Sequence, residues 1–415
     1  MGRNRVSNDV DFVQPDQYVI PPNRKAKQPP PDPKPLPHFE PLHIESPYIG
    51  GAPNLPPDVN PTDPYALFRL IFTEELLEEL VAHTNEYAKL HPTKKKNATK
   101  IRPWTNTTTT ELLAYFAVII HMGIHIEPDI ADYWKQTRRQ GTKHFLVYEH
   151  ISLVRFQQLD RMFHISKPKP TDDPRKEDPF DKIATLSEHV RQRFRLFWKP
   201  GTHLAVDEMI TRFTGRAFEP VNIPSKPTPE GFKIWALANE GYILDWLFHA
   251  KGDKNGPIDL DTYWTKEEHF SKTQAVVLDL LIQEDEVTGQ RYIQPNKHIV
   301  WLDNLFTSVK LLSRLRDEGI GAAGTVRTTK TRREVIDENF SPTAGLRKHT
   351  PKIDPPEQID NSLAELKLTY NSQITWGKLY GALSKDGTVM QFAWKDANVV
   401  LFMSTVSNGK ILTSG

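Results

Sequence analysis

Apolar residues recur at helical spacing after Asp63 and again in three later stretches before residue 198. Spacings of three and four residues place side chains on one face of an α-helix. Thr73, followed by two glutamates, is a typical helix start because its hydroxyl can accept a hydrogen bond from a free backbone N–H. The spacing therefore predicts helices around Leu67–Val81, Thr110–Gly123, Leu153–Phe163 and Lys182–Phe197.

The pattern changes at Lys199-Pro200-Gly201, where short apolar runs replace helical spacing. Leu204-Ala205-Val206 predicts a strand that ends at Asp207. A hairpin follows, because Asn239-Glu240-Gly241 separates two runs rich in β-formers. The expected elements after Asp207 are strands at Ile234–Ala238 and Tyr242–Ala250, a helix at Thr273–Ile282, a strand at Ile299–Leu302, a helix at Phe306–Arg316 and a strand at Gly321–Val326.

These elements come in the order of three antiparallel strands, helix, strand, helix and strand. That order predicts a mixed α/β architecture with a ribonuclease-H-like sheet. We therefore expect a core domain over residues 199–333, preceded by a helical region over residues 63–198.

The two ends of the chain have a different texture. Residues 1–62 are crowded with proline, which fixes backbone angles and removes hydrogen-bond donors, so we expect a disordered tail there. Residues 334–415 begin with a polar stretch and then predict a small β-rich insertion. Its expected strands are Leu366–Tyr370, Val389–Trp394 and Val399–Ser404.

Composition narrows the class of protein. The formal net charge is +1, so a nucleic-acid surface would have to arise from clustering of basic residues and not from their excess. The absence of cysteine excludes disulfides, thiolate catalysis and cysteine-bound zinc, and agrees with an intracellular protein. No apolar run approaches the roughly 18 residues that a membrane helix needs.

Two acidic residues, Asp207 and Asp303, each close a strongly apolar strand. Ends of buried strands face the crevice in which α/β sheets usually place ligands. Two carboxylates there repel each other, and a divalent cation such as Mg²⁺ or Mn²⁺ relieves the repulsion. The alternative is structural: Asp207 would begin a turn, and Asp303 would cap the helix expected near Phe306.

The residues around these aspartates resemble the signatures of the piggyBac transposase family. Asp207-Glu208-Met209, followed by Phe213-Thr214-Gly215-Arg216, is similar to the segment that holds the family's first catalytic aspartate. The stretch from Trp301 to Ser308 resembles the second signature. Further short motifs resemble motifs of the family and keep the family's order from about Asp63 to Ser407. They are Glu111-Leu112, Gly123-Ile124, Arg155-Phe156, Lys226-Pro227, Gly231-Phe232-Lys233 and Gly324-Thr325-Val326-Arg327.

The resemblance implies a nuclear, ribonuclease-H-like nuclease that uses Mg²⁺ or Mn²⁺ to nick and join DNA at transposon ends with TTAA targets. It assigns catalysis and metal binding to Asp207 and Asp303, and makes residues 63–198 a dimerisation and DNA-binding region that allows a homodimer. The basic residues that it places on DNA are Arg216, Lys226, Lys233, Arg327, Lys330, Arg332 and Arg333.

The family's third catalytic aspartate lies in a glycine-valine-aspartate phrase, and no such phrase occurs in this chain. Since Asp396 sits in a context typical of the β-rich insertion, we expect a C-terminally truncated family member without strand-transfer activity. Two hypotheses stay open. One is a transposase or its inactive remnant, for which cleavage would depend on divalent ions. The other is a non-catalytic DNA- or chromatin-binding adaptor, for which DNA binding would not.

Overall fold

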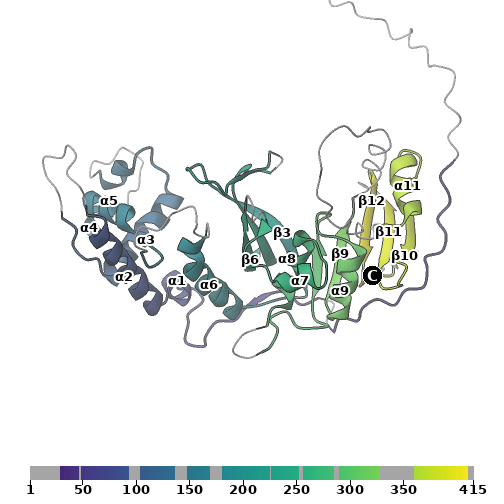
Figure 1. Ribbon diagram of the computed structural model, residues 1–415, viewed down its shortest axis with the longest axis horizontal. Helices are drawn as coiled ribbons and strands as arrows, with labels where there is room; N and C mark the ends of the chain where they lie inside the picture. Colours follow the sequence, from purple (N-terminus) through teal and green to yellow (C-terminus); the bar gives the residue numbers. More distant parts are fainter. Residues whose placement is uncertain are drawn as a thin grey trace, which may run out of the picture.

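The computed structural model describes residues 29–45, 48–92, 103–135, 147–168, 180–224, 226–251, 256–284, 289–327 and 359–409. Figure 1 shows three parts in a row: a group of helices at one end, a twisted sheet with helices beside it in the middle, and a group of strands with one helix at the other end. None of the helices in these residues is long and apolar enough to cross a membrane.

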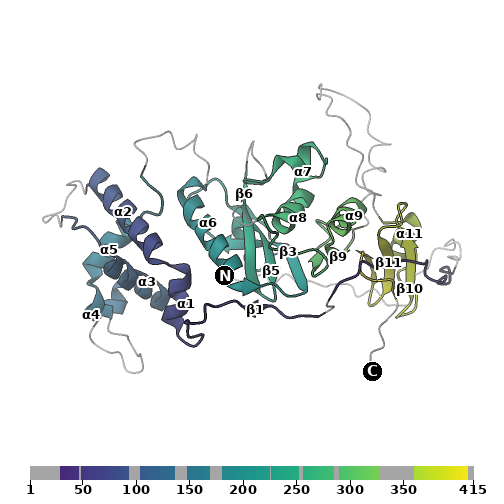
Figure 2. The same ribbon diagram turned by 90° about the horizontal axis from the view of Figure 1, so that it is seen from below.

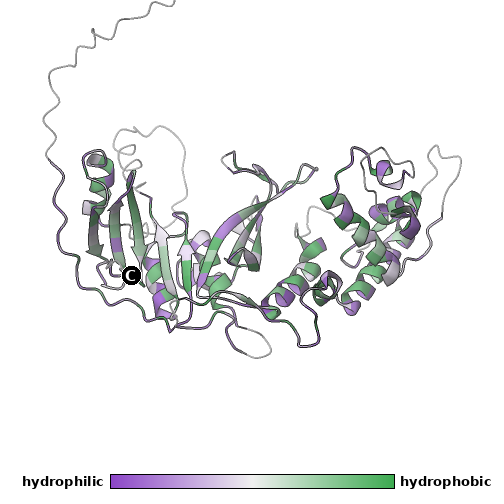
Figure 3. Ribbon diagram, turned by 180° about the vertical axis from the view of Figure 1, so that it is seen from behind, coloured by the Kyte–Doolittle hydropathy of each residue, from purple (hydrophilic) through white to green (hydrophobic). Residues whose placement is uncertain are grey.

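Helices form the first part, as the apolar spacing predicts. They are α1 (Pro64–Ile71), α2 (Glu74–Leu90), α3 (Thr109–Ile124), the 3₁₀ turn η2 (Ile130–Trp134), α4 (Val147–His150), α5 (Leu153–Met162) and α6 (Asp181–Leu196). Thr73 caps α2, since its hydroxyl accepts a hydrogen bond from the backbone N–H of Leu76. Leu77, Leu112 and Leu159 are fully buried where α2, α3 and α5 meet. Figure 3 shows these helices with both hydrophilic and hydrophobic stretches, as amphipathic packing requires.

Helix α6 joins the helices to the sheet. It packs on strand β6 (Tyr242–Ala250), where the buried carboxylate of Asp245 accepts hydrogen bonds from Arg191 and Arg195 of α6. Trp246 donates to the hydroxyl of Ser187 at 3.0 Å. The hydrogen bonds from Arg191 and Arg195 compensate the cost of burying the charge of Asp245.

The sheet has ten strands in the order β10-β11-β12-β9-β8-β3-β5-β6-β7, with β4 paired to β5. Besides β6, the strands are β3 (His203–Arg212), β4 (Val221–Asn222), β5 (Glu230–Asn239), β7 (Gly256–Pro257), β8 (Ile299–Leu302), β9 (Gly321–Thr325), β10 (Leu379–Leu383), β11 (Met390–Lys395) and β12 (Val399–Ser404). β3, β5 and β6 pair antiparallel, whereas β8 and β9 run parallel to β3. The predicted ribonuclease-H-like α/β architecture is confirmed.

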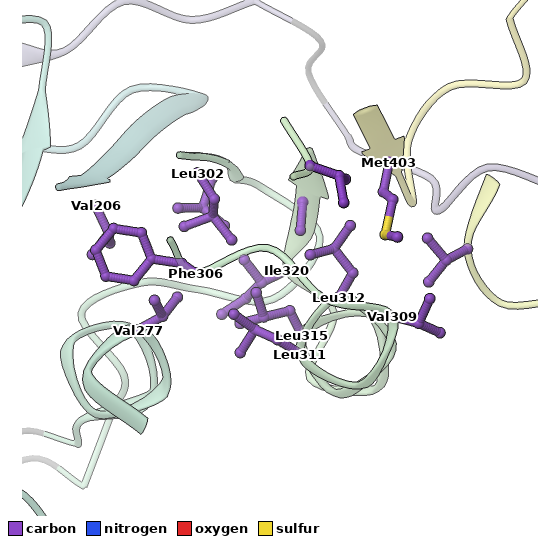
Figure 4. Packing of buried hydrophobic residues seen from close by; sticks show 14 of the residues in the cluster. Val206, Val277, Leu302, Phe306, Val309, Leu311, Leu312, Leu315, Ile320 and Met403 are labelled. Atoms are coloured by element: carbon purple, nitrogen blue, oxygen red, sulfur yellow. The ribbon is translucent and has the colours of Figure 1, made fainter. Parts of the chain in front are cut away.

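One face of the sheet is covered by helices α7 (Thr262–Lys266), α8 (Lys272–Ile282) and α9 (Val309–Asp317). The core lies between them and the strands. Phe306, which is fully buried, packs beside Val206 of β3, with Val277 of α8 close by (Figure 4). Helix α9 begins at Val309 and not at Phe306, because the hydroxyl of Ser308 caps it by accepting from the N–H of Leu311.

The C-terminal part departs from the prediction in two ways. Leu366–Tyr370 was predicted to be a strand, and this is wrong: helix α11 (Asn361–Thr369) occupies it, capped by Asp360. The buried residues Leu363 and Leu366 are three apart, which is a helical spacing, and the alternation around Leu366 was misleading. In addition, β10–β12 do not form a separate insertion, because β12 pairs antiparallel with β9 and extends the central sheet.

The described residues before Asp63 lie along the molecule and are packed only sparsely, with Phe39 and Ile44 as the buried apolar side chains among them. Figure 2 shows this segment running along the molecule from β10 and β11, past β1 (Ala52–Pro53), to α1. Phe39 is buried against Met390 and Phe392. Strand β1 pairs with β2 (Trp198–Lys199). Proline prevents this segment from building a core of its own, but not from packing on an existing one. Residues 1–28, 46 and 47 lie outside the described residues.

Candidate functional site: two aspartates at one edge of the sheet

Asp207 is carried by β3, whose residues alternate between two environments. Leu204 and Val206 are buried in the core, whereas Ala205 and Asp207 point to the other face and are exposed. One carboxylate oxygen of Asp207 accepts the backbone N–H of Glu208 at 2.7 Å. This bond restrains one oxygen of the carboxylate.

Asp303 follows β8 and begins the turn that leads into α9. Its backbone carbonyl accepts from the N–H groups of Phe306 and Thr307 and from the Thr307 hydroxyl. Its carboxylate lies 3.5 Å from the hydroxyl of Thr325 on β9. The structural alternative, that Asp303 caps the helix, is wrong, because Ser308 provides that cap.

Close packing holds the Asp303 turn against β9. A Cβ added to Gly324 would lie 2.2 Å from the Thr307 hydroxyl and 2.6 Å from the carbonyl of Leu302. Both distances are shorter than atoms tolerate, so only glycine lets the turn approach β9 so closely. The motif that contains Gly324 and the motif that contains Asp303 are therefore packed against each other, although the two residues are 21 positions apart in sequence.

The parallel register brings the two aspartates together. Val206 of β3 is opposite Leu302 of β8, so Asp207 and Asp303 occupy the next position on neighbouring strands. Both lie on the face of the sheet away from α8 and α9, at the end where β3 and β8 leave their pairing. Their oxygen atoms are ligands that suit Mg²⁺ or Mn²⁺. Among the residues that the structure describes, no third acidic or histidine side chain joins them in a group that could hold a metal ion.

A second charged group lies on the core side of the same strand. Glu208 accepts a hydrogen bond from Lys233 of β5 at 2.8 Å and lies 3.7 Å from the ammonium of Lys226. Partial burial acts to raise the pKa of Glu208, but the hydrogen bond and charge of Lys233, together with Lys226, outweigh it and hold the pKa below its usual value. Lys233 also lies over the ring of Trp235, 3.9 Å from its centroid.

The remaining predicted DNA contacts fall into two groups. Arg216, beyond the end of β3, and Arg327, beyond the end of β9, are both exposed. Lys330, Arg332 and Arg333 lie outside the described residues. Lys226 and Lys233 differ from Arg216 and Arg327 because both lysines form ion pairs with Glu208.

Sequence reasoning missed the aromatic neighbours of the aspartates. Trp301, two residues before Asp303, is half exposed on the same face of the sheet. Its indole N–H donates to the imidazole of His203 at 3.0 Å. The signal was available, since Trp301 interrupts an otherwise aliphatic strand at a position that alternation assigns to the open face.

Two of the motifs in the helical region, Glu111-Leu112 and Arg155-Phe156, also contact each other. Arg155 of α5 donates two hydrogen bonds to the Glu111 carboxylate on α3, at 2.6 and 2.7 Å, and a third to the carbonyl of Thr105. The Arg155 guanidinium lies over Trp104 at 4.4 Å. This bidentate pair joins α3 to α5, and it holds the pKa of Glu111 below its usual value mainly through the Arg155 hydrogen bond.

Comparisons with known proteins identify the family. A family model described as Transposase IS4 matches residues 63–414. The human (Homo sapiens) PiggyBac transposable element-derived protein 2 is 26% identical over 271 residues, which is 65% of this chain and 41% of that protein. The chain belongs to the piggyBac-type transposase family.

Other relatives agree with this assignment. The human PiggyBac transposable element-derived protein 3 is 25% identical over 268 residues, covering 64% of this chain and 40% of that protein. A solved structure, the piggyBac transposase synaptic complex with hairpin DNA, matches with a TM-score of 0.55 at 20% identity, over 86% of this chain and 63% of that chain. This structural likeness concerns the fold. The chain spans about two fifths of the length of these human relatives.

Proposed function

We propose that this piggyBac-type protein binds DNA along the sheet edge that carries Asp207 and Asp303. The parallel pairing of β3 with β8 supports this proposal, because it puts two exposed carboxylates at the same end of neighbouring strands. Exposed like charges on adjacent strands are unfavourable for stability alone, and a functional role accounts for their position.

Asp207 and Asp303 would hold a divalent cation, Mg²⁺ or Mn²⁺. Their hard oxygen atoms fit such an ion, and both side chains are accessible from solvent. When bound, the ion would supply electrostatic stabilisation of phosphoryl oxygens. The chain's own contribution is to keep the two carboxylates in fixed positions, through the β3–β8 register and the Asp303 turn on Gly324.

We further propose that the 415-residue chain does not cleave or join DNA. Two carboxylates can hold a divalent ion weakly, whereas a pair of ions that activates both attacking and leaving oxygens normally needs a third carboxylate. Within the described residues the pair is without such a partner. The function proposed is therefore DNA binding by a protein that keeps a remnant of a strand-cleavage site. We propose that it acts in the nucleus and that its DNA targets are transposon ends with TTAA sequences.

Arg216 and Arg327 are the described residues best placed to contact the DNA backbone. Each follows a strand that borders the aspartate edge, and each is exposed. Arginine forms bidentate contacts with phosphate that fix the register of a duplex. Lys226 and Lys233 would join them only on release from Glu208. Lys330, Arg332 and Arg333, which lie outside the described residues, are proposed as further phosphate contacts.

The second candidate function is a domesticated DNA- or chromatin-binding adaptor, which is favoured because no third carboxylate joins the pair among the described residues. The two candidate functions differ in whether DNA affinity depends on a divalent cation. An adaptor binds DNA equally well in EDTA and in Mn²⁺, whereas a metal-dependent site binds a transposon end more tightly when Mn²⁺ bridges the aspartates and a phosphate.

The test uses a labelled duplex with a TTAA-flanked end, incubated with the protein in Mn²⁺ or EDTA. We expect binding in both conditions, Mn²⁺-dependent tightening that is lost in Asp207→Ala and Asp303→Ala, and no cleaved or joined product. Cleavage that either substitution abolishes would contradict the proposed inactivity. Binding that ignores Mn²⁺ and both substitutions would support the adaptor instead.

A homodimer is proposed as the assembly. Helix α3 and the turn after it expose several large apolar residues, among them Ile120, Ile124 and Ile126. An uncharged apolar face can meet its own copy across a two-fold axis without placing like charges together. Sedimentation should show concentration-dependent dimers that Ile124→Lys weakens; monomers at all concentrations would rule this assembly out.

A further inference from the structure

Glu208, the neighbour of Asp207 on β3, holds two lysines on the face of the strand opposite to the Asp207 side chain. Both oxygens of Glu208 face an ammonium group, one from Lys233 and one from Lys226. The side chains of Glu208 and Lys233 are 15% and 13% exposed, whereas Lys226 is 32% exposed. Lys226 is therefore the member of this group, which we call the Glu208 cluster, that solvent and phosphate can reach.

The local fold makes the Glu208 cluster. Glu208 is opposite Trp235 in the antiparallel pairing of β3 with β5, and Lys233 precedes Trp235 by two residues on the same face. The Lys233 ammonium makes a cation–π contact with the face of the Trp235 ring. β5 can approach the end of β3 because residue 231 is glycine: a Cβ there would lie 2.0 Å from the carbonyl of Thr211. The Gly231-Phe232-Lys233 motif thus provides both the close packing of Gly231 on β3 and the positive charge of Lys233.

The charges of the cluster matter to its neighbours. Ionised Glu208 leaves two lysines and one glutamate with a net charge of +1, and without it the net charge would be +2. Glu208 is held as a carboxylate by its ion pairs with Lys233 and Lys226. The next residue along the strand is Asp207. Glu208 and Asp207 point to opposite faces of β3, so the charges of the cluster act on Asp207 across the strand and not by direct contact.

We propose that Glu208 is a positioning residue that withholds Lys226 and Lys233 from DNA and shields the Asp207–Asp303 edge from their positive charge. The inference rests on the function proposed above. It gives Glu208 opposite effects on two ligands: it strengthens binding of a divalent cation at the aspartates, and it weakens binding of DNA by occupying lysines that phosphate would otherwise recruit.

The experiment compares Glu208→Gln with wild type in two measurements on the full chain. Mn²⁺ affinity is followed by the electron paramagnetic resonance signal of the free ion without DNA. DNA affinity is measured in EDTA with a fluorescein-labelled duplex that carries a TTAA end, at several salt concentrations. We expect Mn²⁺ to bind about 3- to 10-fold more weakly. We expect DNA to bind at least about twofold more tightly, with a log–log salt slope steeper by about one, as one added phosphate contact requires.

A matched control separates this effect from a general change of charge. Glu365→Gln removes the same charge from an exposed position on α11 and should leave both affinities unchanged. A merely structural role for Glu208 would lower both affinities together. Parallel losses, or no difference from Glu365→Gln, would overturn the inference. Wild type that binds neither Mn²⁺ nor DNA would instead overturn the proposed function.

Lys226→Met provides an independent variant in case Glu208→Gln does not fold. Lys226 is the most exposed member of the cluster, so its substitution should leave the fold intact. The expected signs are reversed: Mn²⁺ binds more tightly and DNA more weakly, with a shallower salt slope. In the background of Lys226→Met and Lys233→Met together, Glu208→Gln should no longer tighten DNA. A gain that persists there would show that the lysines are not its cause.

Discussion

At the scale of single residues, the aspartate pair shows what sequence can establish. Asp207 and Asp303 could be selected because each closes an apolar strand, and the parallel order of β3 and β8 then places them at one edge. The Glu208 cluster could not be found in this way. It depends on the β3–β5 register, which puts Glu208 opposite Trp235 and within reach of Lys233. Alternation along one strand does not specify that register.

The first prediction concerns the repulsion within the aspartate pair. Asp303→Asn removes one of two exposed like charges on adjacent strands, so in EDTA the free energy of unfolding should rise by about 0.2–1 kcal/mol. The same variant should lose the increase in Tm that Mn²⁺ gives to wild type, because a ligand that binds only the folded state stabilises it. Thermal unfolding with and without Mn²⁺ measures both. Asp58→Asn, on an exposed loop, should change neither, and an Mn²⁺ shift preserved in Asp303→Asn would contradict the site.

The second prediction concerns the residue that anchors the Asp303 turn. Phe306 is fully buried against the core, 5.9 Å from the Trp235 ring centroid. Phe306→Ala should lower the free energy of unfolding by about 3–5 kcal/mol, since it removes buried area and leaves a cavity. The neighbouring Leu305 is 39% exposed, so Leu305→Ala should cost less than about 1 kcal/mol. Urea denaturation tests both; equal losses would mean that Phe306 is not the anchor.

At the scale of elements, most helices and strands follow the apolar pattern, and the exceptions have physical reasons. Tyr242–Ala250 and Val399–Ser404 have the predicted bounds, because β-formers fill them and turns close them. Helix α11 was predicted to be a strand, since five residues of alternation outweighed a helical pair of leucines. The start of α9 was also placed early, because Phe306 belongs to the turn and Ser308 supplies the cap.

The third prediction concerns the ion pair between α3 and α5. Arg155 and Glu111 are mostly shielded from solvent and joined by two hydrogen bonds, so Arg155→Met should destabilise the fold by about 1–3 kcal/mol at neutral pH. The pKa of Glu111 is lowered in the folded state. The stability that this pair supplies is therefore present above the unfolded value of 4.5 and lost as the pH falls through the folded pKa.

Urea denaturation from pH 7 to pH 3 checks this dependence. The difference between wild type and Arg155→Met should be largest near neutral pH and should shrink below about pH 4.5. Arg161→Met, in the last turn of the same helix α5, provides a control at an exposed position. A difference that stays constant across the range would show that Arg155 acts through packing on Trp104 and not through Glu111.

At the scale of the whole molecule, the segment before Asp63 makes long-range contacts that its local sequence pattern does not predict. Its proline content predicts that it cannot fold alone, and that remains valid. What sequence did not reveal is a long-range role. The segment contacts β11 through Phe39, Asn296 before β8 through Glu45, and Thr202 just before β3 through Ile49. Such contacts join residues more than 150 positions apart, so no local pattern records them.

The last prediction follows from this arrangement. The backbone N–H of Leu42 donates to Thr405, that of Glu45 to Asn296 and that of Asn54 to Phe197, each at 2.8 Å. Amides held in this way exchange slowly only while the segment stays docked, so native-state hydrogen exchange should show protection at all three positions. Phe39→Ala should lower the free energy of unfolding by about 2–4 kcal/mol and release protection at Leu42 first, because Phe39 packs this part of the segment on Met390 and Phe392. His38→Ala, at an exposed neighbouring position, should do neither. Exchange at the rate of an unstructured chain in wild type would mean that the segment is undocked in solution. Protection that survives Phe39→Ala unchanged would instead show that the backbone hydrogen bonds hold the segment without its aromatic anchor.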